Sequence, residues 1–149
     1  MMQYFSLLVF LHIFSIALFT GSWTAVLVLW KRTDWSNPTQ AAASTGGMVS
    51  VGRFASVIAG SLAVLAGLVM ILVQPQIMAV GGLFHTKIFL GATAVGLSHM
   101  VTGRLKKLHN TTNSSDSLEP MDRITPRLAM IVLVLAITTI FLGVRIAHG

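Results

Sequence analysis

Cysteine is absent from this chain of 149 residues, and charged residues make up only 9% of it. Without cysteine there is no disulfide, no iron–sulfur cluster, no thiolate metal site and no covalent c-type haem attachment. An ordinary soluble domain has about a quarter of its residues charged. Since 54% of the residues are hydrophobic, the chain has too little polar surface for a soluble protein. The composition predicts an integral membrane protein.

Acidic residues are scarcer than basic ones: four Asp and Glu stand against ten Lys and Arg, for a formal net charge of +6. No acidic residue lies within an apolar run, which argues against a proton- or cation-coupled transporter. The basic residues lie almost entirely between the apolar runs, and no basic patch interleaved with aromatics is present. The expected partner is the lipid bilayer, and nucleic acid is not an expected partner.

Four apolar runs have membrane-spanning length, at residues 4–30, 53–73, 84–104 and 125–146. The first and third connections are rich in Lys and Arg, whereas the second has no charge. Short basic loops stay in the cytoplasm. We therefore expect an all-α fold with one transmembrane domain, residues 1–149, forming an up-down bundle of four helices. The expected location is the bacterial inner membrane, with both termini on the non-cytoplasmic side.

Three details of this arrangement concern the connections and the ends of the spans. Residues 39–48 are compatible with a short interfacial helix or with an early start of the second span, and the sequence leaves both open. Tyr4 and Trp30 are expected at the two membrane interfaces. The hydrophilic segment 108–123 is expected to be mobile.

Histidines interrupt two of the predicted spans. His85 and His99 lie fourteen positions apart, close to four helical turns, so they share one stripe of the third span. Ala92 and Gly96 lie between them on that stripe and leave room for a flat group. His12 lies in the first span. Because ionisable groups inside a membrane helix are costly, these residues mark a candidate site.

The depths of the histidines decide which of them can share one metal ion. His12 lies about 7 Å and His85 about 13 Å outward from the centres of their spans, and His99 lies about 7 Å towards the cytoplasm. Two imidazole nitrogens on one iron are about 4 Å apart, given metal–nitrogen bonds of about 2 Å. We therefore predict His12 and His85 as the two metal ligands of a haem-like tetrapyrrole.

Basic residues near the histidines are candidates to bind the acid groups of such a ligand. Lys87 is close to the outer pair of histidines. On the cytoplasmic side, His99 is accompanied by Arg53, Arg104 and Arg127, which predicts a second tetrapyrrole site or a seat for an anionic substrate. The simpler interpretations are that the histidines bond neighbouring helices, that Lys87 extends to the interface and that the arginines only set topology.

The chain resembles the four-helix membrane proteins that include the HemJ-type protoporphyrinogen oxidases and CopD-like predicted integral membrane proteins. The similarity rests on short motifs spread over most of the chain: Leu11-His12-Ile13, Gly21, Gly67, His85-x-Lys87, His99, Gly103-Arg104 and Pro126. The resemblance implies haem b held by histidine and, for the HemJ branch, oxidation of protoporphyrinogen. The chain departs from that branch at three places: Leu18-Phe19-Thr20, Trp30-Lys31-Arg32 and Ile124-Thr125.

Three functions are compatible with these residues and with the resemblance. The first is a haem b redox protein of the protoporphyrinogen oxidase type, which passes electrons to quinone or a respiratory partner. The second is a non-catalytic haem protein, an electron carrier or an accessory subunit of a larger membrane complex. The third is a structural subunit without cofactor. Assembly into a homo-oligomer is compatible with each of them.

Overall fold

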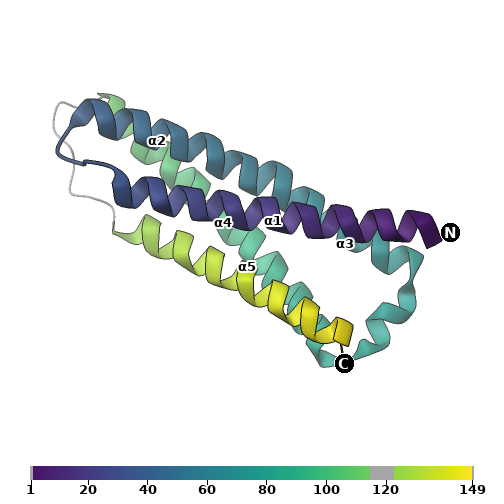
Figure 1. Ribbon diagram of the computed structural model, residues 1–149. Helices are drawn as coiled ribbons and strands as arrows, with labels where there is room; N and C mark the ends of the chain where they lie inside the picture. Colours follow the sequence, from purple (N-terminus) through teal and green to yellow (C-terminus); the bar gives the residue numbers. More distant parts are fainter. Residues whose placement is uncertain (1, 115–122, 149) are drawn as a thin grey trace.

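The structure is a computed structural model that describes residues 2–114 and 123–148 (Figure 1). Every regular element in this part of the chain is helical, so the predicted all-α class is confirmed there. The elements in chain order are α1 (Met2–Arg32), α2 (Pro38–Arg53), the π-helix η1 (Phe54–Gly60), α3 (Ser61–Val73), the 3₁₀ helix η2 (Pro75–Val80), α4 (Gly82–Ser114) and α5 (Ile124–His148). Residues 115–122, part of the hydrophilic segment 108–123 that was expected to be mobile, lie outside the described residues.

The turn between α1 and α2 is fixed by short polar side chains. The Asp34 carboxylate accepts hydrogen bonds from the backbone N–H of Ser36 at 3.0 Å and from its hydroxyl at 2.6 Å. Asn37 then caps α2 by accepting from the backbone N–H of Gln40, and Pro38 occupies the first helical turn. This is the pattern that starts a helix efficiently, because Pro there has no N–H to leave unpaired.

The second long helical segment begins much earlier than residue 53. Residues Pro38–Val73 form one continuous apolar helical stretch of 36 residues. Residues 39–48 are therefore an early start of this segment and not a separate interfacial helix. The π-helical turns at Phe54–Gly60 lie in its middle. Such a π segment inserts extra residues per turn and thereby changes the direction in which the following side chains point.

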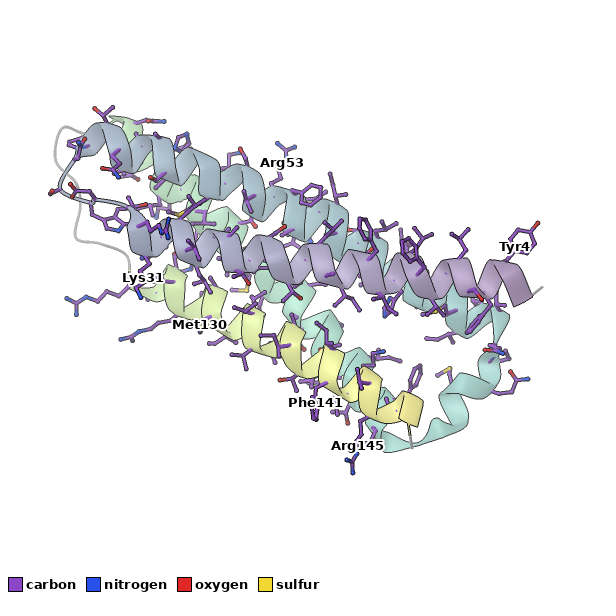
Figure 2. All side chains as sticks on the ribbon, in the orientation of Figure 1. Tyr4, Lys31, Arg53, Met130, Phe141 and Arg145 are labelled. Atoms are coloured by element: carbon purple, nitrogen blue, oxygen red, sulfur yellow. The ribbon has the colours of Figure 1, made fainter. Side chains whose placement is uncertain are left out.

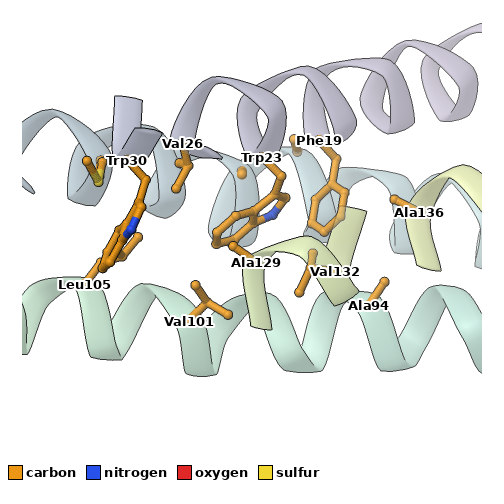
Figure 3. Close-up of a cluster of buried hydrophobic side chains, with 13 residues drawn as sticks. Phe19, Trp23, Val26, Trp30, Ala94, Val101, Leu105, Ala129, Val132 and Ala136 are labelled. Carbon is orange, nitrogen blue, oxygen red and sulfur yellow. The ribbon is translucent and has the colours of Figure 1, made fainter. Parts of the chain in front are cut away.

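One stripe of α1 forms the centre of the packed core. Phe19, Trp23, Val26 and Trp30 follow one another at alternating spacings of four and three residues, so they share a face. They pack against α4 and α5 through a set of smaller side chains (Figure 3): Ala94, Val101, Leu105, Ala129, Val132 and Ala136. Trp30, which the sequence placed at the membrane interface, is only 8% exposed because this stripe turns it inward, with its ring 4.7 Å from that of Trp35.

The four long helical rods do not pack equally along their lengths. α4 packs mainly along α5 and α2, and α3 packs mainly along α1, whereas α3 and α4 barely contact each other. Figure 1 shows α3 and α4 separating towards η2, at the end where both chain termini lie. We call this the pocket end. The opposite end, which contains the turn 33–37, is the packed end.

Three of the helical rods are long and apolar enough to cross a membrane: Tyr4–Arg32, Pro38–Val73 and Ile124–Ile146. This finding is compatible with a membrane protein. α4 is long but less apolar, since it contains His85, Lys87 and His99 as well as several small and hydroxyl residues. It continues to Ser114, well beyond the predicted end at residue 104.

Candidate ligand pocket

A pocket with a volume of about 190 Å³ lies at the pocket end, bounded by α1, η1, α3, α4 and α5. Its wall is mostly apolar. The polar side chains in that wall are His12 of α1, Lys87 of α4 and Thr139 of α5. Small residues on several of these elements create the space, because they replace the large side chains that fill the core at the packed end: Gly60, Ala63, Gly67, Gly91, Ala92, Ala94 and Ala136.

His12 is held in one orientation by a hydrogen bond across the helix interface. Its Nδ1 atom lies 2.8 Å from the backbone carbonyl oxygen of Ala63. A carbonyl oxygen can only accept, so Nδ1 must carry the proton, and in the neutral ring Nε2 keeps its lone pair. No partner of Nε2 is found among residues 2–114 and 123–148. A histidine bonded in this way is prepared to bind a metal through its other nitrogen.

The absence of a side chain at Gly67 leaves the space that the His12 ring occupies. A Cβ atom at Gly67 would lie 3.3 Å from Cε1 and 3.5 Å from Nδ1 of His12. Any side chain there would press on the imidazole and on its bond to Ala63. Ala59, Ala63 and Gly67 repeat at four-residue spacing, a pattern that by itself is typical of close contact between helices. The structure shows that two of its members bound the pocket and position His12.

Lys87 reaches the same pocket from α4. Its side chain lies against α5, where a Cβ atom at Gly143 would be only 3.0 Å from Nζ. The four acidic residues of the chain all lie outside the predicted spans, at Asp34 and in the segment 116–122. Lys87 therefore brings a cationic group into an apolar pocket to which the spans supply no carboxylate. An acid group on a ligand would complement it.

His85 has different surroundings from His12. It is exposed, and its Nδ1 atom lies 3.2 Å from the carbonyl oxygen of Gly81 in its own helix. At about 100° per residue, His85 lies about 200° around α4 from Lys87. Because Lys87 faces the pocket, His85 faces away from it, and it is not part of the pocket wall. The pairing of His12 with His85 on one metal stays a prediction that this arrangement does not support.

The residues of the predicted cytoplasmic site come from three helices. His99 and Arg104 belong to α4, Arg53 ends α2 and Arg127 lies in the first turn of α5. All four are exposed, and none is part of the pocket wall. Figure 2 shows Arg53 projecting outward from its helix. A second tetrapyrrole or anion site formed by these residues stays a prediction.

A polar cluster that the sequence did not indicate joins α2 to the end of α4. His109 Nδ1 lies 3.1 Å from the Thr45 hydroxyl, and its Nε2 lies 3.2 Å from the side-chain amide of Asn113. The Thr45 hydroxyl also lies 3.3 Å from that of Thr112. His109 was expected in a mobile, hydrophilic segment. That expectation is wrong for the residues through Ser114, because α4 continues and packs against α2.

No group of three or more His, Cys, Asp or Glu side chains that could hold a metal ion is found in the described part of the chain. A free metal ion with several protein ligands therefore has no evident site there. A haem is different, because its macrocycle supplies four ligands and one proximal histidine is sufficient.

Comparison of the chain with models of protein families, with curated proteins and with solved structures found no match.

Proposed function

We propose that this chain is an integral membrane redox protein that binds haem b in the pocket, where His12 would ligate the iron. The observation that carries the proposal is the hydrogen bond from His12 Nδ1 to the Ala63 carbonyl oxygen. That bond leaves Nε2 as the only ring atom able to bind iron, and it fixes the ring before the ligand arrives. Haem b supplies a one-electron couple whose potential depends on such axial contacts.

The chemistry of the pocket fits this ligand. An apolar wall suits the macrocycle, and the Lys87 amine suits one propionate. The cavity of about 190 Å³ is small beside ligand pockets of about 300–1,000 Å³. A macrocycle held by His12 would therefore extend past the cavity, and the side where α3 and α4 barely contact each other leaves room for it.

The membrane placement has the four helical rods crossing the bilayer, with both termini on the non-cytoplasmic side. Three rods are apolar enough by themselves, and α4 packs lengthwise against two of them, so one bilayer contains all four. At 1.5 Å per residue, the 33 residues of α4 extend about 50 Å. Lys31 lies at the packed end (Figure 2), where α1 ends with Lys31 and Arg32 and α5 begins next to Arg123 and Arg127. By the charge rule this is the cytoplasmic end.

Two activities are compatible with this site. One is protoporphyrinogen oxidation, with electrons passed to quinone, as the resemblance to HemJ-type proteins implies. The other is electron transfer without substrate chemistry, as a carrier or accessory subunit of a larger membrane complex. Among the described residues of the pocket wall, His12 and Lys87 are the only ionisable ones. A Lys87 ammonium group that pairs with a propionate has no lone pair to accept a proton, and His12 Nε2 is needed for the iron. This shortage favours the second activity.

The test of haem binding is an absorption spectrum. Protein expressed with ample haem and purified in detergent should show a Soret band that is lost in His12→Ala. His85→Ala is the matched control, because it removes an exposed histidine of α4, and its band should remain. A colourless wild-type protein, or a band that persists in His12→Ala, would overturn the proposal.

The test of the oxidase activity is genetic. A strain that lacks protoporphyrinogen oxidase should not be rescued by this chain if it is a carrier or accessory subunit. Rescue that depends on both His12 and Lys87 would assign the oxidase activity instead. Expression has to be verified in the same cells by an immunoblot of the membrane fraction, so that a negative result has a defined meaning.

A further inference from the structure

Four residues of the pocket wall are exposed on the surface of the molecule. They are Val64 and Leu68 of α3, and Ile88 and Ala92 of α4. Val64, Leu68 and Ile88 are 41%, 52% and 43% exposed, although all three also border the cavity. Every other residue of the wall is buried or only partly exposed. The four exposed residues therefore mark where the pocket opens, and we call them the pocket mouth.

The pocket mouth lies between two helices that barely contact each other. At 1.5 Å per residue, Leu68 and Val64 lie about 8 and 14 Å along α3 from its C-terminal end. Ile88 and Ala92 lie about 9 and 15 Å along α4 from its N-terminal end. η2 joins these two helix ends, and Figure 1 shows α3 and α4 separating towards it. The two pairs of residues therefore lie at similar distances from the pocket end.

The mouth is apolar, and it opens sideways between the helices. None of its four side chains has a polar atom. Towards η2 the pocket wall continues with Met70 and Ile71 of α3 and Phe84 of α4, which are only partly exposed. A route along the helix axes from the aqueous phase at the pocket end passes these three large apolar side chains. The route through the mouth passes exposed residues instead, and one of them is an alanine.

In the membrane placement described above, this mouth faces lipid tails. The hydrocarbon layer is about 30 Å thick, and the mouth lies about 8–15 Å from the helix ends at the pocket end. A molecule dissolved in that layer reaches the mouth without crossing water. His12 and Lys87 also line the pocket but are less exposed than the mouth residues. They offer a lone pair and a cationic group, which lipid tails do not provide.

We propose that the pocket is filled from the hydrocarbon layer of the bilayer, through the mouth between α3 and α4. The class of ligand that this route admits is a lipid-soluble molecule, and an acid group on it suits Lys87. Haem b belongs to this class, because its macrocycle is apolar and its two propionates are acidic. The identity of the ligand rests on the proposed function. The position of the mouth rests on the membrane placement alone.

The position of the mouth can be tested without any ligand. Because the chain contains no cysteine, Ala92→Cys takes a single nitroxide spin label. In liposomes, the label should collide readily with oxygen, which concentrates in lipid, and rarely with a water-soluble nickel complex. Val134→Cys on the exposed face of α5 is the lipid reference, and Asn110→Cys near the end of α4 is the aqueous reference. Access of the nickel complex at residue 92, or low access of both reagents, would overturn the proposal.

The route can be tested by closing the mouth reversibly. In the double variant Leu68→Cys with Ile88→Cys, a short bis(methanethiosulfonate) reagent should bridge α3 and α4, and dithiothreitol should release the bridge. Bridged protein should take up haem from liposomes about tenfold more slowly, which corresponds to about 1.4 kcal/mol in the barrier. Each single variant, treated with the same reagent, is a matched control and should load at the wild-type rate. Loading of the bridged protein at that rate would overturn the route.

Release of haem separates a closed route from a damaged site. Protein that is loaded first and bridged afterwards should lose haem to excess apomyoglobin about tenfold more slowly than before bridging. Faster release would mean that the bridge distorts the pocket, and it would overturn the route. If the wild-type protein takes up no haem, the proposed ligand is wrong, and the spin-label measurement alone decides whether the mouth opens to lipid.

Discussion

The two ends of the molecule are built from the same long helices but are packed in opposite ways. At the packed end, Trp23, Trp30 and Leu105 fill the space between α1, α4 and α5, and none is more than 8% exposed. At the pocket end, glycine and alanine occupy the corresponding inward positions, and a cavity remains. One end can therefore hold the helices together while the other keeps room for a ligand.

The largest expected effect tests the packed end. Trp23→Ala should lower stability by about 3–5 kcal/mol, because it empties the centre of the core. Phe84→Ala at the pocket end is the control and should cost much less, since Phe84 already borders a cavity. Thermal unfolding in detergent, followed by circular dichroism, measures both. Equal losses would show that the two ends do not differ as described.

Trp23→Phe refines this test. The Trp23 indole N–H is buried and has no hydrogen-bond partner in the part of the chain that the structure describes. A buried donor without a partner costs about 1–3 kcal/mol, so its removal offsets part of the lost packing. The Phe variant should be much closer to the wild type than to the Ala variant.

The second expected effect tests the contact between Gly67 and the His12 ring. Gly67→Val places a side chain where a Cβ atom is already 3.3 Å from the imidazole, so it should displace the ring from the Ala63 carbonyl. Haem affinity should fall by about 10–100-fold, as for other changes that disturb the support of a ligating histidine. Gly21→Val is the matched control, because nothing lies within 4 Å of a Cβ there. Haem titrations measure both affinities. An equal loss of affinity in the two variants would show that Gly67 does not position His12.

The third effect concerns the charge in the pocket. Lys87→Met should weaken haem binding by about tenfold, or about 1.4 kcal/mol, because a propionate loses its cationic partner. The dimethyl ester of haem has no acid group, and its binding should be the same in both proteins. Absorbance titrations with the two ligands measure the difference. A matched loss with the ester would mean that Lys87 acts through packing alone.

The smallest effect returns to the packed end. His109→Leu removes the hydrogen bonds to Thr45 and Asn113, and it should cost about 1 kcal/mol of stability. Asn110→Leu changes an exposed neighbour on the same helix and should cost less. The unfolding midpoints of both variants and of the wild type measure these costs. An unchanged midpoint in His109→Leu would show that the cluster does not stabilise the contact between α2 and α4.

Sequence patterns predicted the helices better than the contacts between helices. The long apolar runs predicted the long helices. Ser15, Phe19 and Trp23 follow His12 at helical spacing, and all three are buried. Trp30 and the continuation of α4 to Ser114 were missed, because both depend on contacts between helices that are distant in sequence. The hydrogen bond between His12 and the Ala63 carbonyl could not be predicted from sequence, since every residue has a backbone carbonyl.

The helical character of the described chain follows from its amino-acid sequence, because hydrophobic runs, caps and turn residues act over a few neighbouring positions. The face of α4 that turns inward does not follow from such local signals. Lys87 and His85 are two residues apart, so a rotation of the helix exchanges them. Tertiary packing of α4 against α2 and α5 sets that rotation, and it brings the amine, not the second imidazole, to the pocket beside His12.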